Sequence, residues 1–107
     1  MAAVMTFAVI RSRGPAWDPS LPMRGQPDWD AHARFMNALA AEGFVLLGGP
    51  LGDGERTLLV IEAASPDAVR ERLAPDPWTS RGLLRIDSIT PWQILLRHAD
   101  GAHQRPA

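Results

Sequence analysis

The chain contains no cysteine and no lysine, and each absence excludes a class of chemistry. Without cysteine it has no disulfide, no thiolate nucleophile and no cysteine metal cluster, and we expect a cytoplasmic protein in a reducing environment. Without lysine it has no side-chain amine for Schiff-base catalysis. All eleven basic residues are arginines, so anion recognition is left to planar guanidinium groups.

Long hydrophobic runs and an excess of positive charge are also missing. No apolar stretch has the length that crosses a bilayer, and residues 1–7 lack the basic region that opens a secretory signal. The net charge of −1 provides no basic stripe for a nucleic-acid backbone. We therefore expect no membrane or nucleic-acid partner. The 107 residues predict one domain over residues 1–96 and a flexible polar tail over 97–107.

Apolar runs and turn signals alternate along the chain. Gly43 suits the left-handed end of a helix, and Ser65 followed by Pro66 is typical of a helix start. Gly48-Gly49-Pro50 interrupts an apolar run, which predicts a bulge or kink. The predicted elements are a strand over residues 4–10, a long loop over 11–27, a helix over 28–42, strands over 44–47 and 56–62, a helix over 66–74, an irregular passage over 76–82 and a strand over 83–89, which residues 91–96 either extend or follow with a short edge strand.

The order strand, helix, strand, strand, helix, strand predicts an α+β, ferredoxin-like βαββαβ fold with two helices on one face of an antiparallel sheet. The apolar runs at residues 44–47 and 58–61 are nearly continuous, which indicates that both faces of the sheet are buried. The helices cover one face, and a second copy of the chain is the expected cover for the other. We therefore predict a homodimer whose sheets meet face to face.

His32 is the residue best suited to catalysis. It shares one face of the predicted first helix with apolar neighbours, so its imidazole points inward. An imidazole titrates near neutral pH and suits general acid/base chemistry, and Asp76 is the acid that could orient it and stabilise the imidazolium. The structural alternatives are a core histidine bonded to a backbone carbonyl and a turn carboxylate before Pro77.

Further residues outline a small-molecule pocket around this pair. Trp29 and Trp78 lie near it in sequence and are predicted to wall the pocket, although core packing is an alternative role. Gly49 and Pro50 precede a turn and a strand rather than a helix, which argues against a phosphate loop, and their backbone is predicted to line the cleft. No metal-ligand spacing stands on one rigid element, so we expect no metal and no cofactor. The arginines at positions 11, 13, 24 and 34 are predicted to be solvated, and pairing of one of them with an anionic substrate is the alternative.

In these motifs the chain resembles the YCII-related family, in the branch also called DGPF-domain proteins, over residues 4–96. The resemblance implies a dimeric α+β barrel built from ferredoxin-like protomers, with His32 and Asp76 as the active-site pair. The segments that carry it are Trp29-Asp30-Ala31-His32, Glu42-Gly43, Gly48-Gly49-Pro50-Leu51, Asp76-Pro77-Trp78 followed by Gly82-Leu83, and Ile89-Thr90-Pro91-Trp92.

The resemblance also implies two kinds of function. One relative is a dehydrochlorinase that acts on a chlorinated hydroxyhydroquinone, and muconolactone isomerase shares the barrel. We therefore expect an enzyme of unestablished substrate in which His32 moves a proton on a small cyclic or aromatic molecule. Some relatives occur beside sigma factors, so the alternative is a non-catalytic dimer that binds a small molecule and has a regulatory role linked to transcription.

Overall fold

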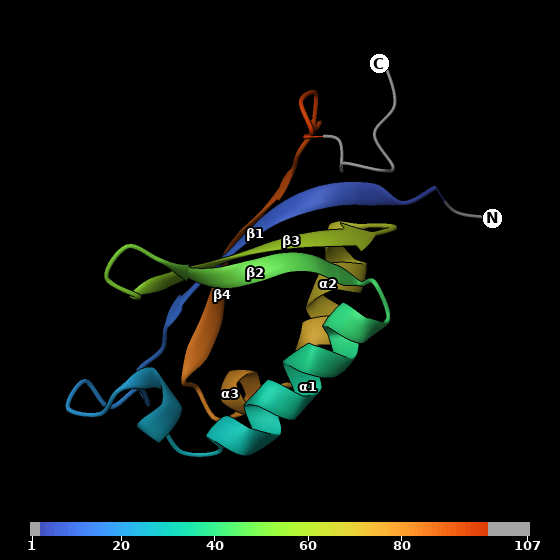
Figure 1. The fold of residues 1–107 in the computed structure, drawn as a ribbon. Coiled ribbons are helices and arrows are strands. Elements are labelled where there is room, and N and C mark those ends of the chain that lie inside the picture. The colour runs from blue at the N-terminus through green and yellow to red at the C-terminus, as the bar shows by residue number, and fades with distance from the viewer. Residues whose placement is uncertain (1–2, 99–107) are drawn as a thin grey trace.

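The computed structural model describes residues 3–98 and contains one four-stranded antiparallel sheet. The strand order is β2-β3-β1-β4, and the helices lie against one face of the sheet (Figure 1). The predicted α+β, ferredoxin-like fold is therefore confirmed. The elements in chain order are β1 (Met5–Arg13), the 3-10 helix η1 (Met23–Gly25), α1 (Trp29–Ala41), β2 (Val45–Leu51), β3 (Arg56–Ala63), α2 (Pro66–Leu73), α3 (Pro77–Ser80) and β4 (Leu84–Pro91).

The hydrophobic core lies between the sheet and the two longer helices. Phe7 and Val9 of β1 are fully buried and pair with Ile61 and Leu59 of β3 in the same ladder. Full burial of side chains of this size stabilises the fold by roughly 1.5–3 kcal/mol each. Because side chains alternate between the two faces of a strand, Arg11 also falls on the helix-facing side of β1.

Helix α1, which carries His32, has a defined contact at its start and a left-handed glycine after its end. Asp28 precedes the helix with a left-handed φ of 60°, and its carboxylate accepts a hydrogen bond from Arg81 rather than capping the helix. This contact joins the start of α1 to the end of α3. The helix closes at Gly43, whose φ of 83° is the left-handed conformation predicted for it.

Helix α2 begins at the predicted signal, with Pro66 in its first turn and the Ser65 hydroxyl accepting a hydrogen bond of 3.1 Å from the Ala68 N–H. Ser65→Ala should lower the free energy of unfolding by about 1 kcal/mol, because that N–H loses its acceptor. Urea denaturation of variant and parent measures the difference. Ser65→Asp keeps an acceptor and should unfold close to the parent, so equal losses in both variants would contradict the capping role.

The predicted loop over residues 11–27 is shorter and more ordered than expected. Strand β1 continues to Arg13, η1 forms near the other end, and the buried amide of Gln26 fastens the segment between them. Gln26 accepts a hydrogen bond from the Asp18 N–H and donates to the backbone carbonyls of Asp18 and Leu21, at 3.0, 2.7 and 3.0 Å. Within this segment, Trp17 packs against Trp78 of α3.

The prediction that Gly48-Gly49-Pro50 interrupts the second strand is wrong. Strand β2 continues to Leu51, and the register shift lies instead between Val45 and Leu47. The proline is tolerated because β2 is an edge strand. Gly48 packs closely against Leu59, because a Cβ at position 48 would lie 2.7 Å from the Leu59 Cδ2 atom and would force that side chain to shift.

Two expectations about the C-terminal part also need correction. The passage over residues 76–82 contains the short helix α3, because the Asp76 side chain caps it by accepting a hydrogen bond from the Trp78 N–H. Strand β4 ends at Pro91, so no edge strand forms over residues 92–98. Most of the predicted tail lies outside the described residues. None of the helices in residues 3–98 is long and apolar enough to cross a membrane.

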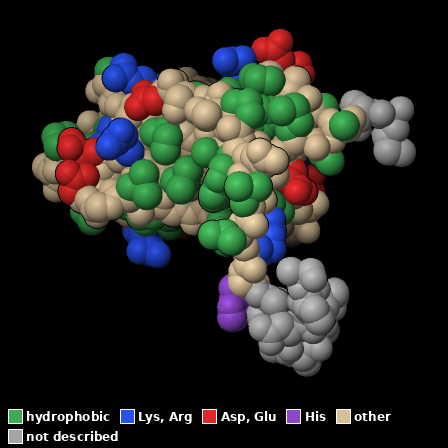
Figure 2. Space-filling model, turned by 90° about the horizontal axis from the view of Figure 1, so that it is seen from above, with side chains coloured by type: hydrophobic (Ala, Val, Ile, Leu, Met, Phe, Trp, Pro, Cys, Tyr) green, Lys and Arg blue, Asp and Glu red, His purple; other side chains and the backbone are tan. Residues whose placement is uncertain are grey.

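The sheet face opposite the helices is apolar and open in the single chain. Ile10 and Leu58 pair on this face, and Leu47 of β2 is 70% exposed beside them. Figure 2 looks onto this face and shows hydrophobic side chains spread across it, with charged side chains toward its margins. The helices therefore account for the burial of only one of the two faces.

Candidate active site

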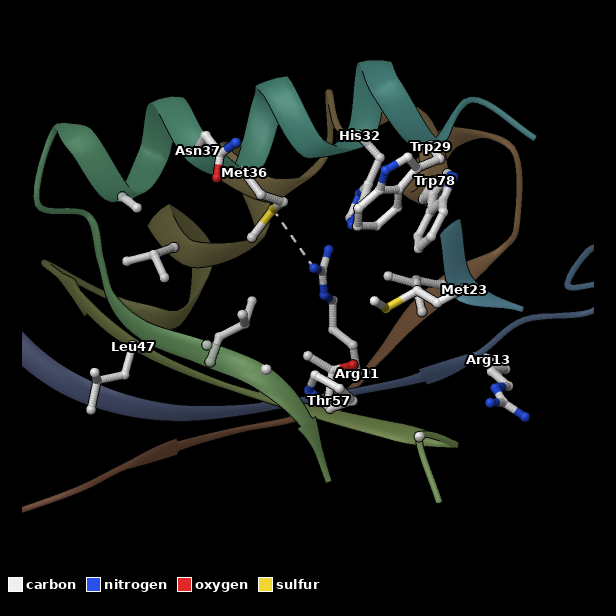
Figure 3. Close-up of a pocket in the computed structure, with 18 of the residues that line it drawn as sticks. Arg11, Arg13, Met23, Trp29, His32, Met36, Asn37, Leu47, Thr57 and Trp78 are labelled. Atoms are coloured by element: carbon white, nitrogen blue, oxygen red, sulfur yellow. Dashed lines mark hydrogen bonds between the residues drawn. The ribbon is translucent and has the colours of Figure 1, made fainter. Parts of the chain in front are cut away.

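A half-enclosed cavity of about 550 Å³ lies between α1 and the helix-facing side of the sheet (Figure 3). This volume is within the range of small-molecule sites. Asp76 lies behind the cavity wall and is fully buried. The other five predicted site residues all line the cavity: Trp29, His32, Gly49, Pro50 and Trp78.

The structure brings His32 and Asp76 into direct contact, although 44 residues separate them. The His32 Nδ1 atom lies 2.8 Å from one carboxylate oxygen of Asp76 and 3.0 Å from the other. His32 is 8% exposed and lines the cavity. Its imidazole therefore contacts the buried Asp76 carboxylate through Nδ1 and also borders the cavity. The alternative of a core histidine bonded to a backbone carbonyl does not describe this arrangement, whereas Asp76 is also the carboxylate before Pro77 that caps a helix.

Asp76 is held as a carboxylate. Burial opposes its ionisation, but the hydrogen bond and charge of His32, the Trp78 N–H and the Arg11 guanidinium outweigh burial and place the pKa of Asp76 below its ordinary value. An ionised carboxylate only accepts hydrogen bonds, so the His32 Nδ1 atom carries the proton. In the neutral form of His32, the Nε2 atom therefore has a lone pair that can take a proton from a ligand.

Arg11 is the residue that sequence reasoning missed. It was predicted to be solvated, but it is 2% exposed, and its Nη1 atom donates to the second oxygen of Asp76 at 2.9 Å. Burial lowers the pKa of Arg11, against the effect of Asp76, yet an arginine stays protonated in a protein. The alternation of Phe7, Val9 and Arg11 would have indicated that Arg11 is buried if the predicted strand had continued beyond Ile10.

An aromatic wall surrounds the imidazole. Trp78 stacks on His32 with ring centroids 3.9 Å apart and planes 7° apart, and its indole N–H donates to the Pro27 carbonyl at 2.7 Å. The ring centroid of Trp29 lies 5.8 Å from that of His32 and 5.6 Å from that of Trp78. Trp17 packs edge-on against Trp78. The wall fixes the plane of the imidazole and supplies an apolar surface for a flat ligand.

The arrangement suits proton transfer. His32 is a base whose tautomer and ring plane are both fixed, and it borders a cavity with apolar and polar lining. The buried Arg11 cation binds the same Asp76 carboxylate. No group of three or more histidine, aspartate or glutamate side chains within residues 3–98 is placed to hold a metal ion.

The chain matches one family model and is similar to a solved structure. The YCII-related domain matches residues 5–93, and comparison with curated proteins gives no match. Among solved structures, the chain is similar to the 5-chloro-2-hydroxyhydroquinone dehydrochlorinase TftG from Burkholderia phenoliruptrix, in complex with 2,5-dihydroxybenzoquinone. The two are 29% identical with a TM-score of 0.57, and the match covers 94% of this chain and 100% of the other. Since the family match spans most of its length, this protein belongs to the YCII-related domain family.

Proposed function

We propose that the protein is a small enzyme that moves a proton on a cyclic or aromatic, oxygen-bearing substrate, in a dehydrochlorination or an isomerisation. The observation that carries this proposal is the bond between the His32 Nδ1 atom and the buried Asp76 carboxylate at the edge of the cavity. His32 is the general base and acid in this proposal. Asp76 is a positioning residue, because it acts through the imidazole and has no contact with the cavity.

The proposed reaction begins with transfer of a substrate proton to the His32 Nε2 atom. The carboxylate of Asp76 then balances the imidazolium, and the stacked Trp78 adds a cation–π contribution. In a dehydrochlorination the electrons of the broken bond to hydrogen form a double bond, and chloride leaves with the electrons of its own bond. In an isomerisation the imidazolium returns the proton to a different atom of the substrate.

Two further observations support this class of substrate. The cavity wall combines Trp29 and Trp78 with the backbone at Gly49 and Pro50, which suits a flat ring of modest size. The similar dehydrochlorinase acts on a chlorinated hydroxyhydroquinone and was solved with a dihydroxybenzoquinone. We include a chlorinated hydroxyhydroquinone as the first compound to test for that reason.

The direct test is to incubate the protein with 5-chloro-2-hydroxyhydroquinone and follow free chloride together with the ultraviolet–visible spectrum of the ring. An enzyme of this class should release chloride in step with quinone formation, and a lactone panel followed by NMR tests isomerisation in parallel. Saturable binding of these compounds without chloride release or any change in the ring would contradict the enzyme proposal. It would favour the non-catalytic binding module instead.

We also propose that the protein is a homodimer in which the open sheet faces of two copies meet. The face contains Ile10, Leu58 and Leu47, and hydrophobic side chains continue across it in Figure 2. An apolar sheet face of this kind in a monomer exposes surface that self-association removes from water. The margins carry the charged side chains, as expected for the rim of an interface.

Leu47→Asp should convert the proposed dimer into a monomer, because it places a charge in the apolar face. Leu47 is 70% exposed in the single chain and points away from α1 in Figure 3, so the protomer should remain folded. Analytical ultracentrifugation should give about twice 11.7 kDa for the parent and 11.7 kDa for the variant. Leu21→Asp makes the same change at an exposed leucine outside the sheet, between β1 and η1, and should remain dimeric. A parent that sediments as a monomer would disprove the dimer.

A further inference from the structure

The guanidinium of Arg11 has more hydrogen-bond donors than its protein neighbours use. A guanidinium carries five N–H donors in a planar fork. One donor of Nη1 binds Asp76, and Nη2 contacts the Met36 sulfur at 3.7 Å. The Nε atom is buried and has no hydrogen-bond partner within residues 3–98. Because an unmade buried hydrogen bond is costly, the edge formed by Nε and Nη2 would gain from an acceptor that the described residues do not supply at Nε.

Arg11 lines the cavity, and Figure 3 shows its side chain rising from β1 toward Met36 on α1, with Thr57 beside its base. A thioether is a weak acceptor on a flexible side chain, so an oxygen atom of a ligand can replace it at Nη2. The same picture places Arg13 at the far end of the view from Met36, where its guanidinium stacks on Trp17.

The charges around the Asp76 carboxylate indicate which kind of ligand the Nε and Nη2 edge of Arg11 would bind. The charges of Arg11 and Asp76 cancel each other, so the buried group carries no net charge when His32 is in its neutral form. The Arg11 Nη1 and His32 Nδ1 atoms lie 2.9 and 3.0 Å from the same oxygen of Asp76, so base and cation are immediate neighbours. Proton uptake by His32 leaves the buried group with a net charge of +1, which a negative charge on the ligand compensates.

We propose that the Nε and Nη2 edge of Arg11 binds an anionic oxygen of the substrate, of the phenolate or enolate type. This inference rests on the proposed function and narrows its substrate to cyclic compounds with an acidic O–H, or with an acidic C–H next to a carbonyl. The N–H bond at His32 Nε2 forms as that O–H or C–H bond breaks. The electron pair stays on the substrate, and its negative charge is carried by the oxygen at Arg11.

The test measures the binding of two probes that undergo no reaction, 4-nitrophenol and the neutral, similarly shaped 4-nitroaniline. The wild type should bind 4-nitrophenolate at least about 10-fold more tightly than 4-nitroaniline, because the charge-assisted contact exists only for the anion. Bound 4-nitrophenol should also ionise more readily than the free phenol, which raises the phenolate absorbance at fixed pH. Equal affinity for the two probes in the wild type would overturn the inference without any variant.

Arg11→Lys keeps a cation that reaches Asp76 but removes the planar fork. It should weaken 4-nitrophenolate binding by about 10-fold and abolish the rise in absorbance, while 4-nitroaniline affinity stays within about twofold. The matched control is Arg85→Lys, the same change at a side chain that is 68% exposed in β4, and it should alter neither affinity. Equal loss of both probes in Arg11→Lys would assign Arg11 a structural role only and overturn the inference.

The two proposals fail separately. Selective phenolate binding through Arg11 without turnover of any substrate would contradict the enzyme proposal and leave the anion site intact. Turnover by a protein that shows no preference for phenolate would contradict the anion site and leave the enzyme proposal intact. Once a substrate is identified, Arg11→Lys should lower kcat more than it raises KM, because the negative charge is largest after the proton has moved.

Discussion

His32→Ala is expected to lower kcat by roughly 10²–10⁴-fold, because a positioned general base contributes about that much to a proton transfer. The chain should remain folded, since the imidazole borders a cavity rather than filling the centre of the core. His32→Asn is the sharper variant. Its amide N–H can take the place of Nδ1 at Asp76, whereas nothing in it can take the place of the basic Nε2 atom.

Both variants should therefore lose activity alike, while the asparagine variant keeps more of the stability. Steady-state kinetics and urea denaturation on the same preparations separate these effects. His98, an exposed histidine after the sheet, provides the matched control, and His98→Asn should leave both quantities unchanged. Substantial activity in His32→Asn would remove the imidazole from the mechanism.

Asp76→Asn is expected to cost about 3–5 kcal/mol of unfolding free energy, because it leaves the buried Arg11 charge without its counter-ion. Catalysis should fall as well, since an amide neither balances an imidazolium nor fixes the tautomer of His32. Asp67→Asn changes an exposed aspartate that pairs with the exposed Arg70, and it should unfold close to the parent. A small loss of stability in Asp76→Asn would show that Arg11 finds another partner in the cavity.

The same residue gives a pH dependence with a definite sign. The pKa of Asp76 is lowered in the folded chain, so its carboxylate stabilises the fold fully above the unfolded value of about 4. That contribution is lost as the pH falls through the lower pKa of the folded state. Unfolding free energies measured between pH 7 and pH 2 should therefore decline more steeply in the parent than in Asp76→Asn. Parallel profiles would mean that other carboxylates cause the acid sensitivity.

The site is assembled from three elements around one carboxylate. Asp76 is the N-cap of α3 and at the same time the acceptor for His32 of α1 and Arg11 of β1. A residue in this position couples the start of a short helix to the geometry of the base. This explains why stability and activity are expected to fall together at Asp76, whereas they separate at His32.

Local sequence patterns were sufficient to predict the order of the elements and the face of α1 on which His32 lies. Hydrophobic periodicity places the imidazole on the inner side of α1, and the cap at Ser65 and the left-handed Gly43 mark helix ends. These features depend on residues within a few positions of one another, which is why local patterns reveal them. The family resemblance was also readable from ordered segments, and the match over residues 5–93 confirms it.

Three features depend on contacts between distant segments: the burial of Arg11, the continuation of β2 through Gly48 and Gly49, and the contact between the His32 and Asp76 side chains. Arg11 and Asp76 are 65 residues apart, and the free energy that buries an arginine comes from a carboxylate that no local pattern places beside it. The glycines remain in β2 because β3 supplies their ladder partners and Leu59 occupies the space of a Cβ at position 48. Charge pairing and close packing between distant segments are properties of the fold, so they appear only once the sheet and helices have come together.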